Sequence, residues 1–323
     1  MEWVSAQVVV NTWAFTQATD AGWKTLQSTN QAVSAVEDAC KSCESDRCDG
    51  TVGWGGSPDE HGETTLDAVI MDGTTFDSGA VAGLRNVRDA VSVARAVMEH
   101  SEHSILAGEL AADFAVSMGF NTRSLSSNES ERMFETWKAN NCQPNFWRNV
   151  IPDSATSCGP YSRGTDDSSS SGAYASLHNH DTISVVAVDS LGNIAAASSS
   201  NGANHKIPGR VGDAAIVGAG SYADSSFGGC GATGDGDIMM RFLPCYQAVQ
   251  SLAHGLTPQQ AAEAALRRIG SMFPDFHGGI IVVNNKGDFG AAGWGWRFVY
   301  SSRTLKDNQT QVHQVESLGP KYT

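Results

Sequence analysis

Short apolar, β-branched runs alternate with helical patterns along the first half of the chain. Residues 6–12 form a continuous run, Ala-Gln-Val-Val-Val-Asn-Thr, that is typical of a buried strand. From Ala18 to about Cys43, apolar residues recur at steps of three and four, which predicts a helix after that strand. Residues 66–73 give a second apolar run that ends in a turn, whereas 86–100 and 104–118 again have helical spacing. This alternation of strands and helices is typical of α/β proteins.

The second half begins with a change of composition. Residues 154–176 are rich in Ser, Gly and Asp with almost no aliphatic side chains, which predicts an exposed loop open to cleavage. Residues 178–197 then predict a β-hairpin whose first strand opens at Thr182. The run Thr-Pro-Gln-Gln at 257–260 predicts the start of a helix, and 279–283 with the following Asn-Asn-Lys-Gly turn predicts a second hairpin.

Hairpins in both halves, with long helices between them, favour a single domain over residues 1–323 in which helices cover antiparallel sheets. The alternative is a doubly wound parallel sheet, because residues 218–223 match the G-x-G-x-x-A dinucleotide fingerprint. No strand with an acidic ribose ligand follows that match. The next residues are a glycine tract, 228–236, which we interpret as turns that bring backbone amides close to a small ligand. We therefore expect no cofactor.

Composition narrows the classes of partner. The chain has 323 residues, with 21 Lys and Arg against 35 Asp and Glu, a formal net charge of −14. Such a field repels phosphate backbones and anionic lipid, so we expect neither nucleic acid nor a membrane as partner. No stretch reaches the roughly 18 consecutive apolar residues of a membrane span. These features predict a soluble globular protein.

Seven cysteines bear on the compartment. A zinc site at Cys40-x-x-Cys43 would need a second ligand pair, and none follows at a plausible spacing, so we expect no metal there. Two short-range disulfides, Cys43 to Cys48 and Cys142 to Cys158, would instead fit a secreted or lysosomal protein. An odd number of thiols leaves at least one cysteine free in a monomer.

Two further features concern localisation. The first residues, Met-Glu-Trp-Val-Ser-Ala-Gln, lack the basic and apolar regions of a secretory signal, so we expect any such signal to be absent from this sequence. Glycosylation triplets at Asn128-Glu-Ser and Asn308-Gln-Thr agree with a lysosomal or secreted protein.

The most informative chemistry surrounds Thr182. His178, His180 and Asp181 could be metal ligands, because alternate residues of a strand share one face; the ordinary interpretation is a polar loop that enters a strand. A third interpretation is self-processing. If the bond between Asp181 and Thr182 is cut, Thr182 carries both a nucleophilic hydroxyl and its own α-amine as base. One residue then supplies two catalytic groups, and no distant histidine is needed.

Several motifs together carry a resemblance that extends in order from about Val8 to about Trp294. They are Val10-Asn-Thr-Trp13, Gly55-Gly-Ser57-Pro-Asp-Glu60, Asn145-Phe-Trp-Arg-Asn-Val-Ile-Pro152, His180-Asp-Thr-Ile183, Ile207-Pro-Gly-Arg210-Val-Gly-Asp213 and Ala232-Thr-Gly234-Asp-Gly-Asp237. With them the chain resembles the glycosylasparaginases, also called aspartylglucosaminidases, which are N-terminal-nucleophile (Ntn) hydrolases.

The resemblance implies an α+β fold, the four-layer αββα sandwich of these hydrolases, and a precursor that cuts itself before the threonine by an N-to-O acyl shift. Residues 1–181 would become an α chain and 182–323 a β chain, with 154–176 as the exposed linker and His180, Asp181 and Thr182 at the cut. Thr182 would then cleave N4-(β-N-acetylglucosaminyl)-L-asparagine to aspartate and the amino sugar through a β-aspartyl ester. The family also implies glycoprotein degradation in the lysosome and an (αβ)₂ heterotetramer.

The resemblance also assigns the groups that hold the amino-acid head of the substrate. Arg210 would pair with the α-carboxylate, for which a planar guanidinium is suited, and Asp213 would accept from the α-ammonium. Without the motif, an Arg and an Asp three residues apart would be interpreted as a surface ion pair. By resemblance, Trp13 contacts the substrate side, although an aromatic residue there is more often part of a core.

Four further positions complete the site that the resemblance implies. Thr233 and Gly234, otherwise ordinary turn residues, would form the oxyanion hole from a hydroxyl and a backbone amide. Ser57 and Ser200 would complete the surroundings of the nucleophile.

The sequence departs from the family pattern in three respects. Position 200 is Ser where the family commonly has Thr, which keeps the hydroxyl. Ser184 stands where the family usually has Gly, so its side chain is expected to crowd the scissile turn or the substrate pocket. The cysteines of further C-terminal disulfides are expected to be absent, and only the two N-terminal bridges match.

Two other functions stay open. A plant-type L-asparaginase or isoaspartyl peptidase would have the same fold and a different substrate, but its members usually lack the Asn-Thr-Trp entry and the His-Asp before the nucleophile, both of which are present here. An unprocessed, non-catalytic secreted relative has only Ser184 as support.

Overall fold

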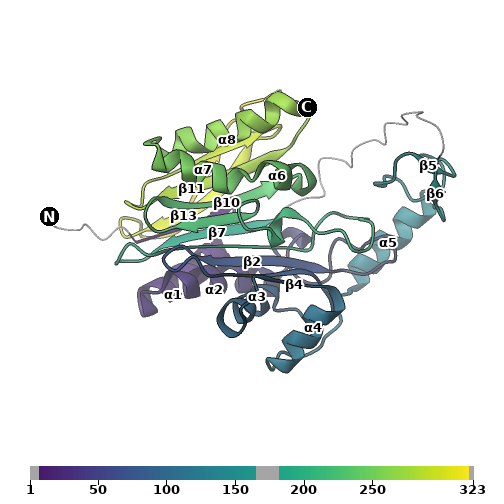
Figure 1. Ribbon diagram of the computed structural model, residues 1–323, viewed down its shortest axis with the longest axis horizontal. Helices are drawn as coiled ribbons and strands as arrows, with labels where there is room; N and C mark the ends of the chain where they lie inside the picture. The colour runs from purple at the N-terminus through teal and green to yellow at the C-terminus, as the bar shows by residue number, and fades with distance from the viewer. Residues whose placement is uncertain (1–6, 165–181, 320–323) are drawn as a thin grey trace.

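The computed structural model describes residues 7–164 and 182–319, and its largest element is an eight-stranded sheet (Figure 1). The strands lie in the order β14-β13-β1-β7-β8-β2-β3-β4, and only β3 and β4 are parallel. Their bounds are β1 Val8–Thr12, β2 Leu66–Asp72, β3 Ser78–Leu84, β4 Ile105–Ala107, β7 Ile183–Val188, β8 Ile194–Ser200, β13 Phe298–Thr304 and β14 Gln311–Val315. Antiparallel pairing everywhere else makes the parallel-sheet alternative wrong.

A second, antiparallel sheet has the order β12-β11-β10-β9, and a small pair, β5 and β6, lies apart from both. The bounds are β5 Val150–Ile151, β6 Ser162–Arg163, β9 Ser221–Asp224, β10 Gly228–Gly234, β11 Gly278–Asn284 and β12 Phe289–Trp294. The helices are α1 Thr16–Thr29, α2 Ala32–Asp46, α3 Ala90–His100, α4 Gly108–Ser117, α5 Asn128–Ala139, α6 Gly236–Phe242, α7 Pro244–Ala253 and α8 Pro258–Met272, with single turns η1 Cys48–Gly50 and η2 Asp213–Ala215.

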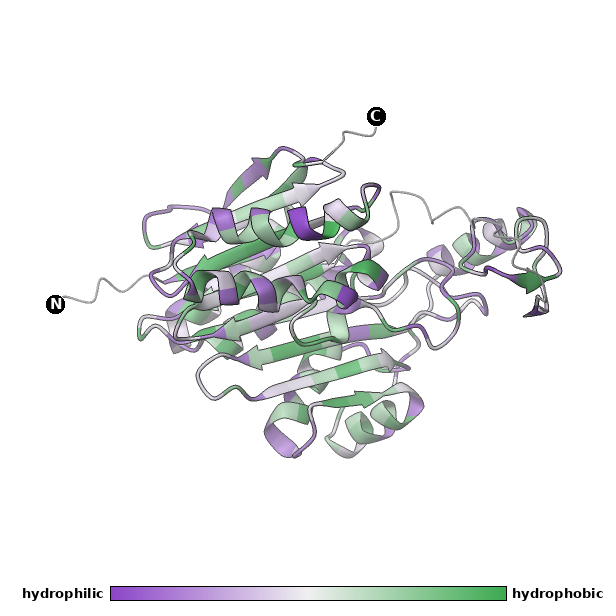
Figure 2. Cartoon of the chain, turned by 45° about the horizontal axis from the view of Figure 1, so that its top comes forward, coloured by the Kyte–Doolittle hydropathy of each residue, from purple (hydrophilic) through white to green (hydrophobic). Residues whose placement is uncertain are grey.

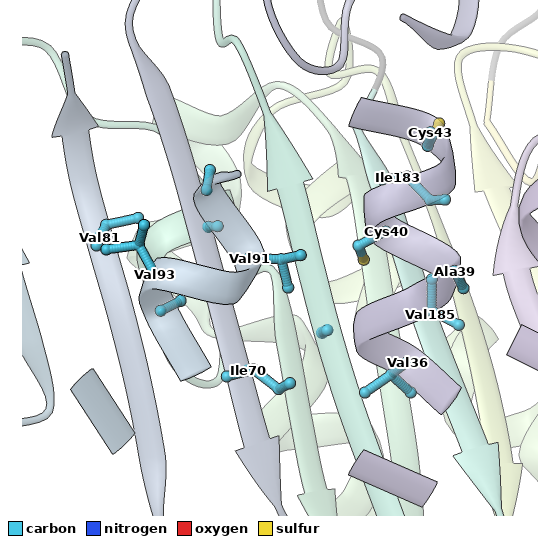
Figure 3. Close-up of a cluster of buried hydrophobic side chains, with 14 of the residues drawn as sticks. Val36, Ala39, Cys40, Cys43, Ile70, Val81, Val91, Val93, Ile183 and Val185 are labelled. Atoms are coloured by element: carbon cyan, nitrogen blue, oxygen red, sulfur yellow. The ribbon is translucent and has the colours of Figure 1, made fainter. Parts of the chain in front are cut away.

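The helices pack on the sheets from two sides. α2 and α3 contact β2, β3, β7 and β8 of the eight-stranded sheet, whereas α7 and α8 contact the four-stranded sheet. Figure 3 shows the first of these interfaces, with Val36, Ala39 and Cys40 of α2 beside Ile183 and Val185 of β7. The two sheets contact each other mainly through β7, β8, β9 and β10. Apolar residues therefore lie in three buried clusters, one under each helical layer and one between the sheets.

Most predicted elements are present. The hairpin that follows Thr182 is β7 and β8, which pair Ile183 with Ser199, and the second hairpin is β11 and β12. α8 begins with the predicted capping box between Thr257 and Gln260. The helix predicted from Ala18 to Cys43 is two helices, because Asn30 adopts a left-handed conformation (φ 53°) that ends α1. The segment 104–118 begins with the strand β4 before its helix α4.

The interpretation of the glycine tract as turns is wrong, because Gly228–Gly234 forms the buried strand β10. Two of its glycines face the large sheet closely: a Cβ at Gly229 would lie 2.7 Å from Val186 Cγ1, and one at Gly231 would lie 2.7 Å from Ser184 Cβ. Glycine here permits a close approach of two sheets. The dinucleotide match at 218–223 leads into β9 and opens no helix, so its fingerprint interpretation fails too.

Three disulfides occur among the described residues. Cys43–Cys48 and Cys142–Cys158 confirm the predicted pairs. Cys230 on β10 and Cys245 on α7 form a third, which corrects the expectation that the C-terminal part carries no further bridge. Cys40 is free and buried.

The zinc alternative at Cys40 is therefore wrong, because its partner Cys43 is oxidised. In the part of the chain that the structure describes, no group of three His, Cys, Asp or Glu side chains could hold a metal ion. His178, His180 and Asp181 lie outside the described residues.

The segment that carries α5, β5 and β6 projects from the body of the molecule (Figures 1 and 2). It contains the start of the predicted linker loop, 154–176, whose remainder from 165 onward lies outside the described residues. Ser154 is buried and β6 pairs with β5, so the first part of that loop is more structured than its composition predicts. None of the described helices is long and apolar enough to cross a membrane.

Candidate active site

Thr182 immediately precedes β7 and is 3% exposed. Its carbonyl oxygen accepts a hydrogen bond from Thr12 Oγ1 at 2.7 Å, and the same Thr12 oxygen accepts from the backbone N–H of Ser184 at 3.0 Å. A side chain from β1 thus fixes the backbone on both sides of Ile183. The predicted nucleophile is held at the start of an interior strand of the large sheet.

Thr233, near the end of β10, contacts both Thr182 and Trp13. Its Oγ1 accepts from the backbone N–H of Thr182 at 3.0 Å and from Trp13 Nε1 at 3.1 Å. A hydroxyl oxygen that accepts two hydrogen bonds keeps its own hydrogen to donate to a further acceptor. The structure therefore brings together three of the predicted site residues, which come from the two sheets and from the turn after β1.

Gly234 follows Thr233 with a φ of 132°, where side chains are strongly disfavoured. A Cβ at this position would lie 2.4 Å from the carbonyl oxygen of His277. Only glycine fits at this buried position at the end of β10.

Arg210 and Asp213 converge near the start of α6. A Cβ at Gly236 would lie 2.5 Å from Asp213 Oδ1 and 3.0 Å from Arg210 Nη2, so this glycine makes room for both side chains. Because Gly236 is two residues beyond Gly234, the pair lies close to the end of β10. Arg210 also donates to Asp237, with Nη2 and Oδ2 3.1 Å apart.

The Asp213 carboxyl is buried, and its Oδ2 has no hydrogen-bond partner among the described residues. Burial raises its pKa to about 7, although the positive charge of Arg210 opposes the shift. A buried, incompletely paired carboxyl is costly, and such groups gather at functional sites. It is suited to accept hydrogen bonds from a cationic ligand.

Ser200 and Ser57 border this region. Ile183 pairs with Ser199, which places Thr182 and Ser200 at the same end of the hairpin. Ser200 Oγ accepts from the backbone N–H of Gly202 at 2.9 Å. Ser57 is buried with a φ of 34°, and its carbonyl oxygen accepts from Lys206 Nζ at 3.2 Å.

Ser184 does not fit the expectation of crowding. Its side chain lies between the two sheets, where Oγ contacts Ser198 Oγ at 2.7 Å and donates to the carbonyl oxygen of Ala232 at 2.6 Å. The missing side chain of Gly231 provides the space. The added side chain is accommodated by a glycine on the facing strand.

Comparison of the sequence with known proteins identifies the family. A family model described as asparaginase matches residues 2–311. The chain belongs to this asparaginase family. Its membership confirms the prediction of a hydrolase of this family, made from the motifs around Thr182, Arg210 and Thr233.

Relatives of this asparaginase-family chain carry two kinds of name. The N(4)-(β-N-acetylglucosaminyl)-L-asparaginase of Rattus norvegicus is 51% identical over 88% of this chain and 83% of its own length, and that of Mus musculus is 50% identical over 88% and 83%. A protein of Arabidopsis thaliana named "Probable isoaspartyl peptidase/L-asparaginase 3" is 49% identical over 95% of this chain and 90% of its own length.

Sequence reasoning missed two buried charged residues of the candidate site. Asp67, on β2, accepts from the backbone N–H groups of Gly212 and Gly83, both at 2.8 Å, and burial raises its pKa. Lys206 is 2% exposed. For Lys206, one signal in the sequence indicated a place in the site, namely its position directly before the motif 207–213. For Asp67 there was none, because the pattern around it is that of an ordinary strand.

Proposed function

We propose that the protein hydrolyses the side-chain amide bond of N4-(β-N-acetylglucosaminyl)-L-asparagine to aspartate and the amino sugar. The observation that carries this proposal is the hydrogen bond from the N–H of buried Thr182 to Thr233 Oγ1, which places a threonine at a strand start beside a hydroxyl donor. The names of the rat and mouse relatives support the substrate.

The first step in this proposal is self-cleavage. Thr182 Oγ attacks the carbonyl carbon of Asp181, the C–N bond between the two residues breaks, and an ester forms that water hydrolyses. The products are a chain ending at Asp181 and a chain beginning with the free α-amine of Thr182. That amine replaces the histidine of a conventional triad as the base that accepts the hydroxyl proton.

Turnover then uses the same hydroxyl. Oγ attacks the side-chain amide carbon, and the proton it loses passes through the α-amine to the departing nitrogen, which leaves with the sugar. Water hydrolyses the resulting β-aspartyl ester and releases aspartate. The hydroxyl of Thr233 and the backbone N–H of Gly234 would donate to the oxyanion in both steps of turnover.

Two charged side chains would hold the amino-acid head. Arg210 would bind the α-carboxylate and Asp213 the α-ammonium. Because the pKa of Asp213 is raised to about 7, the free enzyme carries the required negative charge only partly at neutral pH, and a bound ammonium would favour ionisation. Trp13, Ser57 and Ser200 would line the site.

The finer features of fold and assembly belong to the same proposal. Helices on the outer faces of two contacting sheets support the four-layer αββα sandwich of Ntn hydrolases. Three disulfides support a lysosomal or secreted location, where such bonds persist. An (αβ)₂ heterotetramer follows from the family resemblance.

Denaturing intact mass with N-terminal sequencing tests the mechanism. We expect two pieces, the second beginning at Thr182, and Thr182→Ala should give one uncut chain without amidase activity. Thr182→Ser should cut and turn over more slowly, because the hydroxyl remains. Full activity of the alanine variant, or an uncut and fully active wild type, would refute an N-terminal threonine mechanism.

The name of the Arabidopsis relative favours a second candidate function, hydrolysis of L-asparagine or β-aspartyl peptides at the same site. Rates on glycosylated asparagine, free asparagine and a β-aspartyl dipeptide separate the two. We expect the highest kcat/KM on the glycosylated substrate; a higher value on either of the others would assign the chain to the second function. A non-catalytic relative is the third outcome, with no turnover of any of them.

A further inference from the structure

We propose that Lys206 is a positioning residue of this site: its ammonium group ties the Ser57 loop to the end of β8 and adds a second positive charge beside Arg210. Nothing in the family resemblance assigned a role to this lysine. The inference rests on the proposed function, because the ligand it concerns is the α-carboxylate of an aspartyl substrate.

The contacts of Lys206 join two segments that are distant in sequence. Nζ donates to the carbonyl oxygen of Ser57 at 3.2 Å and to that of Asn201 at 2.8 Å. The carbonyl oxygen of Lys206 itself accepts from the N–H of Glu60 at 3.0 Å, so its backbone also pairs with the loop that contains Ser57. Since Asn201 directly follows Ser200, this one side chain fixes two predicted site segments relative to each other.

The surroundings of Lys206 point to an anion. Lys206 Nζ and Arg210 Nη1 lie 3.7 Å and 3.1 Å from one point, the position that a Cβ of Gly202 would occupy. Two buried cations so close together repel each other unless an anion lies between or beside them. The acidic groups that act on Lys206 are Asp67, Asp59 and Glu63.

Two of these acidic groups, Asp67 and Glu63, also bind partners other than Lys206. Both oxygens of Asp67 accept backbone N–H groups, those of Gly83 and Gly212, and Glu63 forms an ion pair with Arg85. A substrate carboxylate would supply further negative charge to the two cations. Glycine at position 202 leaves the point between them free of a side chain.

The charge of Lys206 depends on pH in a useful range. Burial and the charge of Arg210 lower its pKa to about 8, while Asp67, Asp59 and Glu63 oppose the shift. As pH rises through about 8 the side chain loses its positive charge. Affinity for a carboxylate ligand should therefore weaken over that range if Lys206 contributes to it.

Three variants separate the hydrogen bonds of Lys206 from its positive charge. Lys206→Met removes both the charge and the hydrogen bonds, Lys206→Gln keeps donors without the charge, and Lys206→Arg keeps a charge that does not titrate. Lys286→Met, in the exposed turn between β11 and β12, is the matched control for a lost lysine. The readouts are KM and kcat, calorimetric affinity for L-aspartate from pH 6.5 to 9.5, and hydrogen exchange at 57–60 and 200–202.

We expect Lys206→Met to raise KM and the Kd for L-aspartate about tenfold, as for one lost hydrogen bond to a charged group, with a smaller change in kcat. Lys206→Gln should show the same weakening but slower exchange than Lys206→Met. In the wild type and Lys286→Met, affinity should fall above pH 8; in Lys206→Arg this fall should be absent. A role in stability alone would lower the melting temperature without changing the pH profile.

The proposal is overturned if Lys206→Met and Lys206→Gln bind L-aspartate as the wild type does, or if Lys206→Arg keeps the wild-type pH profile. Should Lys206→Met fail to fold, the glutamine and arginine variants still decide. Failure of the proposed function gives a different result: the wild type cuts none of the amide substrates. Hydrogen exchange at residues 57–60 and 200–202 then tests whether Lys206 holds these two segments together. Exchange rates that are unchanged in both Lys206→Gln and Lys206→Met would refute that part of the proposal.

Discussion

At the residue scale, Arg210 shows how a common sequence pattern acquires a particular role through its surroundings. An Arg and an Asp three residues apart would usually be an exposed pair of little energetic weight. Here the Arg210 side chain is only 13% exposed, its ion-pair partner is Asp237, and Asp213 is buried beside it with one unpartnered oxygen. Charges in such a place interact strongly with a ligand because water screens them poorly.

We predict that Arg210→Ala lowers kcat/KM about 100-fold, close to 3 kcal/mol, because the substrate loses a charge-assisted contact with its carboxylate. Cutting at Thr182 should remain largely intact, since the scissile peptide has no free α-carboxylate. Steady-state kinetics and denaturing mass measure the two effects separately. Arg267→Ala, at an exposed i,i+4 pair with Glu263, is the control and should change neither. Equal loss of cutting and turnover would contradict the assigned role.

A second prediction concerns Asp213, whose pKa is raised from 3.8 to about 7 mainly by burial. The folded state holds this proton more tightly than the unfolded state, so the stability that the group contributes is present below about pH 4 and is lost as pH rises to 7. Asp213→Asn should therefore be more stable than the wild type at pH 8, with a free energy of unfolding higher by about a few kcal/mol at most. Near pH 4 the two proteins should differ little in stability.

The same variant should bind substrate poorly, because an amide carries no charge to attract the α-ammonium. Urea unfolding at pH 4 and 8, together with KM, provides the measurement. A variant that is less stable than the wild type at pH 8 would show that the ionised carboxylate is instead well stabilised in the fold.

At the scale of elements, β10 is the strand whose behaviour departs most from its composition. Glycine usually weakens a strand, but the glycines of β10 let it pack closely on β7. Ser184 uses the space at Gly231 to donate into the facing strand at the carbonyl oxygen of Ala232. The two sheets are therefore fitted to each other at the position two residues from the nucleophile.

We predict that Gly231→Ala destabilises the protein by about 1–3 kcal/mol, because its Cβ would lie 2.7 Å from Ser184 Cβ. The double variant with Ser184→Gly should recover part of that loss, which a double-mutant cycle of urea unfolding measures. Gly229→Ala contacts Val186 instead and is the control that Ser184→Gly should not rescue. Strict additivity of Gly231→Ala and Ser184→Gly would mean that they do not interact.

At the scale of the whole molecule, the two pieces expected from cutting are interleaved. β1 lies between β13 and β7, and β2 pairs with β8, so strands from before and after Thr182 pair with each other within one sheet. Separating the pieces would break these ladders and expose the buried cluster under α2 and α3. Pairing of this kind would keep Thr182 in place after a cut before it.

We therefore predict that the cut protein elutes as one species under native conditions and gives two pieces only after denaturation. Native and denaturing mass spectra of one sample measure this. Because the disulfides among described residues, Cys43–Cys48, Cys142–Cys158 and Cys230–Cys245, each lie within one expected piece, reduction should leave native association unchanged. Release of the piece beginning at Thr182 in native buffer would contradict the interleaved arrangement.

The sequence by itself determined what depends on near neighbours: both hairpins, the capping box of α8, the two disulfides within single neighbourhoods and the position of Thr182 at a strand start. Motif order was enough to identify the family. Only the tertiary structure decided what depends on distant partners. The glycine tract is a strand because another sheet packs on it, Cys230 meets Cys245 across β10 and α7, and Asp67 and Lys206 join the site through contacts with backbone groups far away in sequence. Contacts between residues far apart in sequence produce no regular pattern of residue types along the chain, so sequence periodicity cannot reveal them.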